Sequence, residues 1–319
     1  MKKLKILGFL PNEGGCAYYR MIMPLNKLLE LYPDKIELKF TKNPLEMDEK
    51  TGEMKTDEYA FPEIEWCDVI VTNNISNYGG NYTARTIGIA KKLGKFVHYD
   101  TDDLLIDLYD GHRLKGVYLE KGLYDMVKFM YSSADLVTVT QKKFAERIQP
   151  YCGGVLAIVK NSIDYNLPCW NSPRHLVKRG KKRITRIGWA AGIHHEEDVK
   201  EFTGVPYRVN SKCGVERIQW DFYGSPPREH EPDGTLKWQS QVWETYKKHL
   251  LHGFKGQKNW AVHGAMPPDR YGIMIANMDV GIAPLQMNDF NDSKSEIKVG
   301  ELGRYRVPLI ASNVGCYDE

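Results

Sequence analysis

The sequence lacks the segments that mark several large classes of protein. No apolar run approaches the roughly 18 residues needed to span a bilayer. The basic start, residues 1–10, leads into Pro11 without a small-residue cleavage site, which favours a first β-strand over a signal peptide. The six cysteines form no C-x-x-C pair and no zinc spacing, so we expect free thiols in a reducing compartment. These absences predict a cytoplasmic protein without a transmembrane segment.

Common catalytic and nucleotide-binding motifs are also missing. The sequence contains no G-x-x-x-x-G-K-[ST], G-x-G-x-x-G, G-x-S-x-G or H-E-x-x-H string. Their absence disfavours P-loop enzymes, nicotinamide or flavin Rossmann enzymes, α/β-hydrolases and zinc proteases. The 44 basic and 41 acidic side chains leave a net charge of +3, which does not by itself indicate a nucleic-acid partner.

What the sequence does contain is an alternation of strands and helices. At roughly 150 residues per domain, 319 residues correspond to two domains. Strands are predicted at 4–10, 36–40, 68–72, 96–99, 134–140, 156–160, 184–189, 219–223, 260–262, 279–284 and 307–311. Helices are predicted at 18–31, 83–93, 116–132, 141–150, from about 194, and at 235–252, 268–276 and 294–304. This order predicts α/β architecture with parallel sheets covered on both faces.

The alternation of strands and helices is interrupted once, and this interruption divides the chain into two parts. Residues 166–182 contain Pro168, Pro173 and Gly180 and are predicted to be a linker. We expect one Rossmann-like domain at 1–165 and a second at 183–319. Ligands of such sheets bind at the carboxyl ends of the strands, so two edges facing a cleft are expected.

Four segments, in a fixed order along the chain, carry a resemblance to a known family. Segment 279–312 combines a strand ending in Pro, a loop, a helix with a Glu, and a strand ending in Ile-Ala-Ser. Segment 14–20, Gly-Gly-Cys-Ala-Tyr-Tyr-Arg, is similar to a first glycine loop, and 134–164 to the last strands of an amino-terminal domain. Segment 187–199 is similar to the start of a donor domain. Together they resemble GT-B-fold glycosyltransferases, in particular retaining family 4 members of bacterial and viral type.

The resemblance implies two tandem doubly wound Rossmann-like domains, with the first on the acceptor side and the second binding a nucleotide sugar. The residues it implies for the donor and its phosphates are Gly14, Gly15, Arg20, Gly192, His195, Lys294, Ser295 and Glu301. The candidates on the acceptor side are Tyr18, Asp100, Asp102 and Asp103.

Physical reasons support several of these assignments. The glycines lack Cβ, so a phosphate or sugar can approach the backbone. Lys294 offers a point charge for a diphosphate, and Glu301 can accept hydrogen bonds from two ribose hydroxyls. Several of these residues also have a plain structural interpretation: ordinary turns for the glycines, a core or surface position for His195, and solvated helix positions for Lys294, Ser295 and Glu301.

Three features depart from the family pattern. The family has a second Glu eight residues before the ribose Glu, where this chain has Ser293. Residues 188–199 contain no Lys or Arg, so charge neutralisation is expected from Lys294, Lys298, Arg20 or helix dipoles. The sequence ends at Glu319, earlier than family members do, so we expect a donor domain shortened at its end.

The sequence therefore predicts transfer of a sugar from a nucleoside diphosphate sugar to an acceptor hydroxyl, with retention and without a cofactor. Asp100-Thr-Asp102-Asp103 imitates a D-x-D metal motif, but metal independence is favoured because that motif belongs to a one-domain fold. The acceptor is open among carbohydrate, lipid-linked sugar and nucleic acid. Seven cations at 174–186 suit a solvated linker, an anionic membrane surface or a nucleic acid. Alternatives are a DNA-modifying viral-type enzyme and an inert nucleotide-sugar-binding or scaffold protein.

Overall fold

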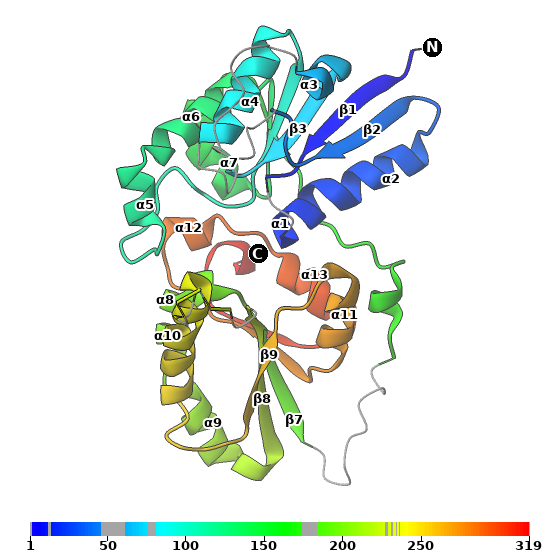
Figure 1. The fold of residues 1–319 in the computed structure, drawn as a ribbon. Coiled ribbons are helices and arrows are strands. Elements are labelled where there is room, and N and C mark those ends of the chain that lie inside the picture. The colour runs from blue at the N-terminus through cyan, green and yellow to red at the C-terminus, as the bar shows by residue number, and fades with distance from the viewer. Residues whose placement is uncertain are drawn as a thin grey trace. The chain divides into compact units, whose positions relative to one another are not determined.

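The computed structural model describes residues 2–11, 14–45, 61–75, 81–173, 184–226, 229, 230, 232, 233, 235 and 237–318. The described chain divides into two compact units (Figure 1). The first unit contains residues 1–110, 114–162 and Asp292–Ser295, and the second contains Gly111–Arg113, Ile163–Asn291 and Glu296–Glu319. Each unit therefore includes a short piece of chain that belongs by sequence to the other half.

The first unit is built on a six-stranded parallel sheet in the order β2-β1-β3-β4-β5-β6. Its strands are β1 Leu4–Phe9, β2 Ile36–Thr41, β3 Val69–Asn73, β4 Phe96–Asp100, β5 Leu136–Val139 and β6 Val155–Ile158. The central strands are buried on both faces, which explains their nearly continuous apolar sequences.

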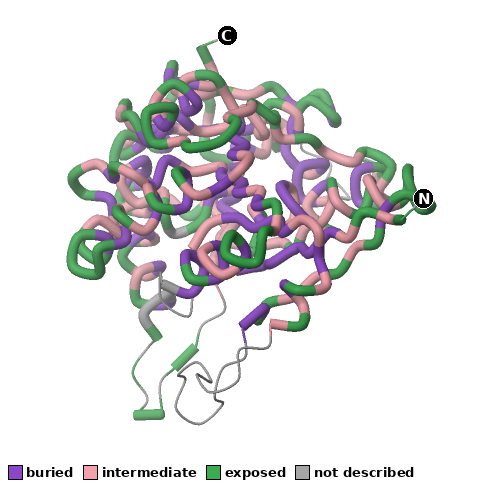
Figure 2. Tube along the Cα trace, turned by 90° about the horizontal axis from the view of Figure 1, so that it is seen from above, coloured by how far each residue is buried: buried purple, intermediate pink, exposed green. Residues whose placement is uncertain are grey.

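Helices connect these parallel strands. They are α1 Gly15–Ala17, π-helical Tyr18–Ile22, α2 Met23–Leu31, α3 Pro62–Trp66, α4 Asn81–Lys92, α5 Lys115–Glu120, α6 Leu123–Ser133 and α7 Lys142–Ile148. The single helix predicted at 116–132 is divided in two, because Gly122 adopts a left-handed conformation with φ of 61°. Buried residues gather in the strands and on the helix faces that pack against them (Figure 2).

The second unit has a five-stranded parallel sheet in the order β11-β10-β7-β8-β9. The strands are β7 Thr185–Ala190, β8 Ile218–Ser225, β9 Trp260–Gly264, β10 Val280–Ala283 and β11 Leu309–Ala311. The helices are α8 Glu196–Phe202, α9 Val205–Cys213, α10 Trp238–His252, α11 Pro268–Ala276, α12 Asp289–Asp292 and α13 Ile297–Gly303. An aromatic cluster that includes Trp189, Trp220 and Trp243 forms much of the core.

The described part of the predicted linker packs within the second unit. The 3₁₀ helix Pro168–Asn171 lies against α11, and Trp170 is only 1% exposed. The contact is close: a Cβ on Gly272 of α11 would lie 2.4 Å from the Cys169 carbonyl oxygen. Residues 174–182 of the predicted linker, and the basic run apart from Arg186, lie outside the described residues.

The predicted helix at 294–304 is wrong at its start. Helix α13 begins only at Ile297, while residues 294–296 are not helical. The side chains of Ser293 and Ser295 hydrogen-bond to Arg147 and Asn161 of the first unit. Short polar side chains that find partners outside a helix stabilise a non-helical backbone.

Both sheets are doubly wound, so the predicted α/β class is confirmed. In the first, β2 and β3 lie on opposite sides of β1, and in the second, β8 and β10 lie on opposite sides of β7. The carboxyl ends of strands at such switch points are where ligands bind in open α/β sheets. Among the described residues, none of the helices is long and apolar enough to cross a membrane.

Candidate active site

The carboxylates that follow β4 form an acidic edge, defined here as Asp100, Asp102 and Asp103. Asp100 is held by Arg20, whose Nε and Nη2 donate to the two carboxylate oxygens at 2.9 and 2.6 Å. Thr138 Oγ1 also donates to Asp100 Oδ1 at 2.5 Å. Both side chains of the ion pair are less than 5% exposed. The buried ion pair between Arg20 and Asp100 therefore fixes the position of the acidic edge from the interior of the unit.

Arg20 also ties the edge to the last strand of the sheet. Its Nη1 donates to the Val159 carbonyl at 2.6 Å and to Asn161 Oδ1 at 3.1 Å. Because Arg20 follows β1 and Val159 follows β6, one guanidinium joins the carboxyl ends of strands from both sides of the switch point. A bidentate guanidinium is well suited to this work because its donors lie in a rigid plane.

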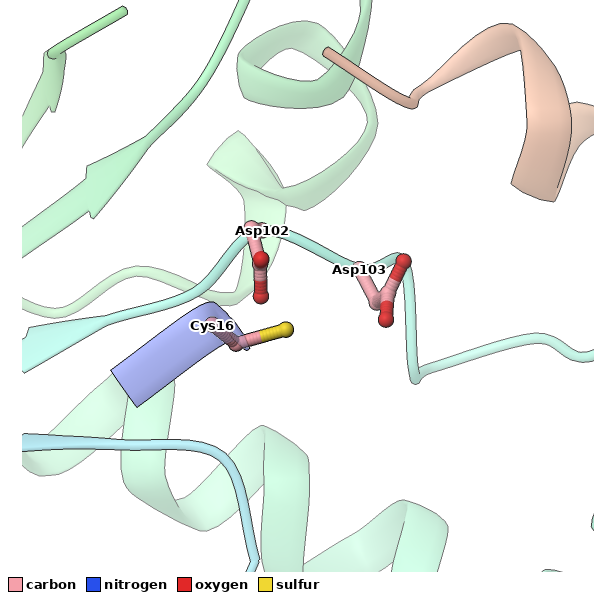
Figure 3. A group of neighbouring side chains, drawn as sticks. All are labelled: Cys16, Asp102 and Asp103. Atoms are coloured by element: carbon pink, nitrogen blue, oxygen red, sulfur yellow. The ribbon is translucent and has the colours of Figure 1, made fainter. Parts of the chain in front are cut away.

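Asp102 and Asp103 face the thiol of Cys16 (Figure 3). One ligand atom from each of the three side chains lies within 4.8 Å of the others. Asp102 Oδ1 is buried and has no hydrogen-bond partner among the residues that the structure describes. Burial, followed by repulsion from Asp103, raises the pKa of Asp102 to about 7. Burial likewise raises the pKa of the Cys16 thiol well above its ordinary value.

This cluster has the donor set that a divalent cation could use, since a thiol and two carboxylates suit Mn²⁺ or Zn²⁺. A protein cation also lies there. Lys294 Nζ is 3.5 Å from Asp103 Oδ1 and belongs to the first unit. The acidic edge therefore has its own source of positive charge in addition to the Arg20 guanidinium.

The glycines predicted to approach a ligand lead into helices at the same kind of edge in both units. Gly14 precedes α1, and its carbonyl accepts from the Tyr18 amide at 3.1 Å. The Tyr18 ring packs edge-on against Tyr19. A Cβ placed on Gly15 or on Gly192 would have no heavy atom within 4 Å. Internal packing therefore does not demand glycine at these two positions, and the space beside the backbone is open.

In the second unit a buried carboxylate lies at the switch point between β7 and β10. Asp198 of α8 is 1% exposed, and its Oδ1 accepts from the Gln286 amide at 2.7 Å and from Asn291 Nδ2 at 2.9 Å. Its Oδ2 lies 2.7 Å from His195 Nδ1. The hydrogen bond at Nδ1 sets the orientation of the imidazole and leaves Nε2 as its outer nitrogen.

Glu301 lies on α13 as predicted, but in a buried cluster. Its side chain is 2% exposed, and Lys298 Nζ donates to Oε2 at 2.9 Å and also to the Tyr271 hydroxyl. Burial raises the pKa of Glu301, while Lys298 opposes that shift. Lys298 is a quarter exposed, so it is the outward-facing member of this pair.

Lys294 and Ser295 belong to a different unit from Glu301. Both belong to the segment Asp292–Ser295 of the first unit. Asp292 pairs there with Lys143 and Arg147 of α7, each at 3.0 Å. Sequence reasoning missed this placement. It also missed Tyr271, for which the sequence offers no signal, whereas Lys298 is recognisable from its position one helical turn before Glu301.

Comparison with known proteins gives similarity in structure only. No family model matches the sequence, and a search of curated proteins finds no match. Solved structures do match: a sucrose-phosphate synthase from Thermosynechococcus elongatus has a TM-score of 0.61 at 11% identity, over 98% of this chain and 82% of that chain. A UDP-forming α,α-trehalose-phosphate synthase from Burkholderia vietnamiensis has a TM-score of 0.58 at 11% identity, over 100% and 84%.

A third match is a trehalose-6-phosphate synthase studied for glycosyl transfer with retention, with a TM-score of 0.56 at 10% identity, over 98% and 85%. The chain has the GT-B fold. This confirms the fold predicted from the four segments, while family 4 is not singled out by these matches. The predicted cleft between the two edges stays a prediction.

Proposed function

We propose that this GT-B protein is a glycosyltransferase that moves a sugar from a nucleoside diphosphate sugar to an acceptor hydroxyl, with retention of configuration. The observation that carries the proposal is the pair of buried carboxylates in the second unit. Asp198 at the β7–β10 switch point orients His195, and Glu301 on α13 is paired with the partly exposed Lys298. The structural likeness to sugar-phosphate synthases along nearly the whole chain supports it.

The chemistry of such a transfer requires groups that stabilise an anionic leaving group. A nucleoside diphosphate gains negative charge as the bond to the sugar breaks, and fixed hydrogen-bond donors lower the energy of that charge. Lys298 and His195 are the side chains we assign to this work in the second unit. Glu301 is assigned to the ribose hydroxyls, because a carboxylate accepts two hydroxyl hydrogen bonds well.

We place the acceptor at the acidic edge of the first unit, where Asp102 and Asp103 can accept hydrogen bonds from a carbohydrate hydroxyl. We also propose that the reaction uses no metal ion. Lys294 lies 3.5 Å from Asp103, so a fixed cation is available where an ion would otherwise be needed.

A screen of UDP-, GDP-, ADP- and CMP-sugars tests the proposal. Purified protein is incubated with each donor, and released nucleoside diphosphate is quantified with and without sugar acceptors. Thermal shift with the same nucleotides gives an independent readout, since a ligand that binds the folded protein raises its melting temperature. Turnover of one donor together with stabilisation by its nucleotide is expected. The absence of both for every donor would refute the proposal.

One observation favours a second candidate, a nucleotide-sugar-binding protein without catalytic activity. The position eight residues before Glu301 is Ser293, which is fully buried in the first unit and hydrogen-bonded to Arg147. No carboxylate stands there to contact the donor sugar. Tight nucleotide binding without release of nucleoside diphosphate, in the presence of a broad acceptor panel, would favour this candidate.

The proposal also covers contact with an anionic surface through the basic run at 174–186. It rests on the seven cations of the sequence, where each basic side chain near such a surface contributes roughly 1 kcal/mol. Co-sedimentation with vesicles containing anionic lipid would support a lipid-linked acceptor. Binding to duplex DNA that falls steeply with salt would support a nucleic-acid acceptor.

A further inference from the structure

The segment Asp292–Ser295 crosses from the second half of the sequence into the first unit and is anchored there at both ends. Asp292 accepts from Lys143 Nζ and Arg147 Nη2 at 3.0 Å each, and its carbonyl accepts from Gln141 Nε2 at 2.6 Å. At the other end, Asn161 Nδ2 donates to Ser295 Oγ at 2.7 Å. The anchors come from the region after β5 and from the residues after β6.

Between these anchors lies Lys294, whose Nζ is 3.5 Å from Asp103 Oδ1. We propose that Asp292 is a positioning residue: it holds Lys294 at the acidic edge, where Lys294 serves the hydroxyl-bearing acceptor and not the diphosphate of the donor. This inference rests on the proposed function and changes the assignment of Lys294 within it.

The distribution of charge supports this division of work. The second unit has its own cation, Lys298, one helical turn from Glu301. At the acidic edge, the Arg20 guanidinium donates to Asp100, Val159 and Asn161, whereas Lys294 lies next to the partly exposed Asp103. Lys294 can donate to one hydroxyl of a carbohydrate while Asp102 Oδ1, which is buried without a described partner, accepts from its neighbour. Two adjacent hydroxyls of a carbohydrate can therefore bind Lys294 and Asp102 at the same time.

The placement of Lys294 depends on Asp292 because the segment is short. Only two residues lie between the anchors Asp292 and Ser295, so a shift of Asp292 moves Lys294 with it. Replacing Asp292 by Asn removes both ion pairs to α7, while the backbone contact with Gln141 remains. Replacing Asp292 by Glu retains the charge and the reach toward Lys143 and Arg147.

Two measurements on the full chain test the assignment. Titration calorimetry with UDP and GDP as probes reports nucleotide binding, and the rate of glycosyl transfer from UDP-glucose or GDP-mannose to glucose reports the acceptor side. The variants are Lys294→Met, Asp292→Asn, Asp292→Glu and, as a contrast in the second unit, Lys298→Met. Glu146→Gln is the control, because it removes an exposed ion pair with Lys142 on the same helix α7.

We expect Lys294→Met and Asp292→Asn to leave the nucleotide Kd within twofold of wild type and to slow transfer at saturating donor at least tenfold. Asp292→Glu should recover at least half of the lost rate, Lys298→Met should weaken nucleotide binding at least fivefold, and Glu146→Gln should change neither quantity. A loss of nucleotide affinity of fivefold or more in Lys294→Met or Asp292→Asn overturns the inference alone. Transfer that is unchanged by Lys294→Met, or absent from a wild type that binds nucleotide, also overturns it. A wild type that binds no nucleotide refutes the proposed function and this inference together.

Discussion

The carboxyl group of Asp102 should make the stability of the first unit depend on pH. Its pKa is about 7 in the folded protein, compared with an ordinary value of 3.8, chiefly because the side chain is buried and secondly because Asp103 is near. A raised pKa means that the folded state binds the proton more tightly than the unfolded state does. The stabilising contribution is therefore complete below about pH 4 and is lost as pH rises through 7.

The magnitude follows from the two pKa values. Each unit of difference corresponds to about 1.4 kcal/mol, and only the part that titrates between the two measured pH values is observed. Between pH 5 and pH 8 the free energy of unfolding should fall by about 2–3 kcal/mol through this one group. Asp102→Asn removes the titration, so the variant should gain that amount relative to the wild type over the same interval.

The assay must report on the unfolding of the first unit. Six of the seven tryptophans follow residue 162, with Trp66 as the exception, so fluorescence reports mainly on the second unit. Hydrogen exchange at the β4 amides of Val97 and Tyr99, corrected for intrinsic rates, measures the first sheet directly. Wild type and Asp102→Asn are compared at pH 5 and pH 8.

Other groups titrate in the same pH range. Their contributions are shared by wild type and Asp102→Asn, so they cancel when the free energies of unfolding of the two proteins are subtracted. As a control, Asp103→Asn removes the like charge, so the pKa of Asp102 should fall, and the loss of stability should end at a lower pH and be smaller between pH 5 and pH 8. A difference between wild type and Asp102→Asn that stays within about 0.5 kcal/mol from pH 5 to pH 8, well below the expected change, would refute the raised pKa.

The second unit offers four further tests. Glu301→Gln should weaken UDP or GDP binding by about 1–3 kcal/mol, since a charged hydrogen bond is lost; an unchanged calorimetric affinity would remove Glu301 from the site. The same change deprives Lys298 of its partner and should lower the melting temperature, which adding Lys298→Met should partly restore. Gly272→Ala should destabilise the second unit by about 1–3 kcal/mol in a fluorescence-detected urea titration, because its Cβ would lie 2.4 Å from the Cys169 carbonyl; an unaltered midpoint would contradict that packing. Asp198→Asn should slow donor turnover about tenfold by releasing the His195 ring, and an undiminished rate would exclude this orienting role.

Much of the fold could be predicted from local sequence patterns. Short apolar runs such as Val69–Asn73 are buried on both faces of a parallel sheet and stand out against the helices between them. Helix α9, Val205–Cys213, was missed although Pro206 lies at its start and Gly214 at its end. Its apolar residues are too few to form a clear period, so the end signals were the only guide.

The candidate site was harder to predict, because its residues are brought together by distant parts of the chain. Cys16 and Asp102 follow different strands and meet only because parallel strands end at the same edge. The position of Lys294 depends on ion pairs between Asp292 and α7. No local pattern reveals that a segment of the second half packs on the first, so its assignment to the donor side was based on its neighbours in sequence.

The two buried carboxylates of the second unit, Asp198 and Glu301, are suited to different roles because their hydrogen-bond partners differ. Asp198 accepts from a backbone amide, a side-chain amide and the His195 ring, so its oxygens are occupied by fixed donors. Such a carboxylate orients its neighbours and cannot rearrange to meet a ligand without losing bonds of about 1–3 kcal/mol each. Glu301 is instead paired on Oε2 with Lys298 and hydrogen-bonded to Tyr271, and of these two partners Lys298 can turn toward a phosphate. On the proposed assignment, a nucleotide that takes up Lys298 would release an oxygen of Glu301 for the ribose, so phosphate and ribose should bind together more tightly than their separate fragments suggest.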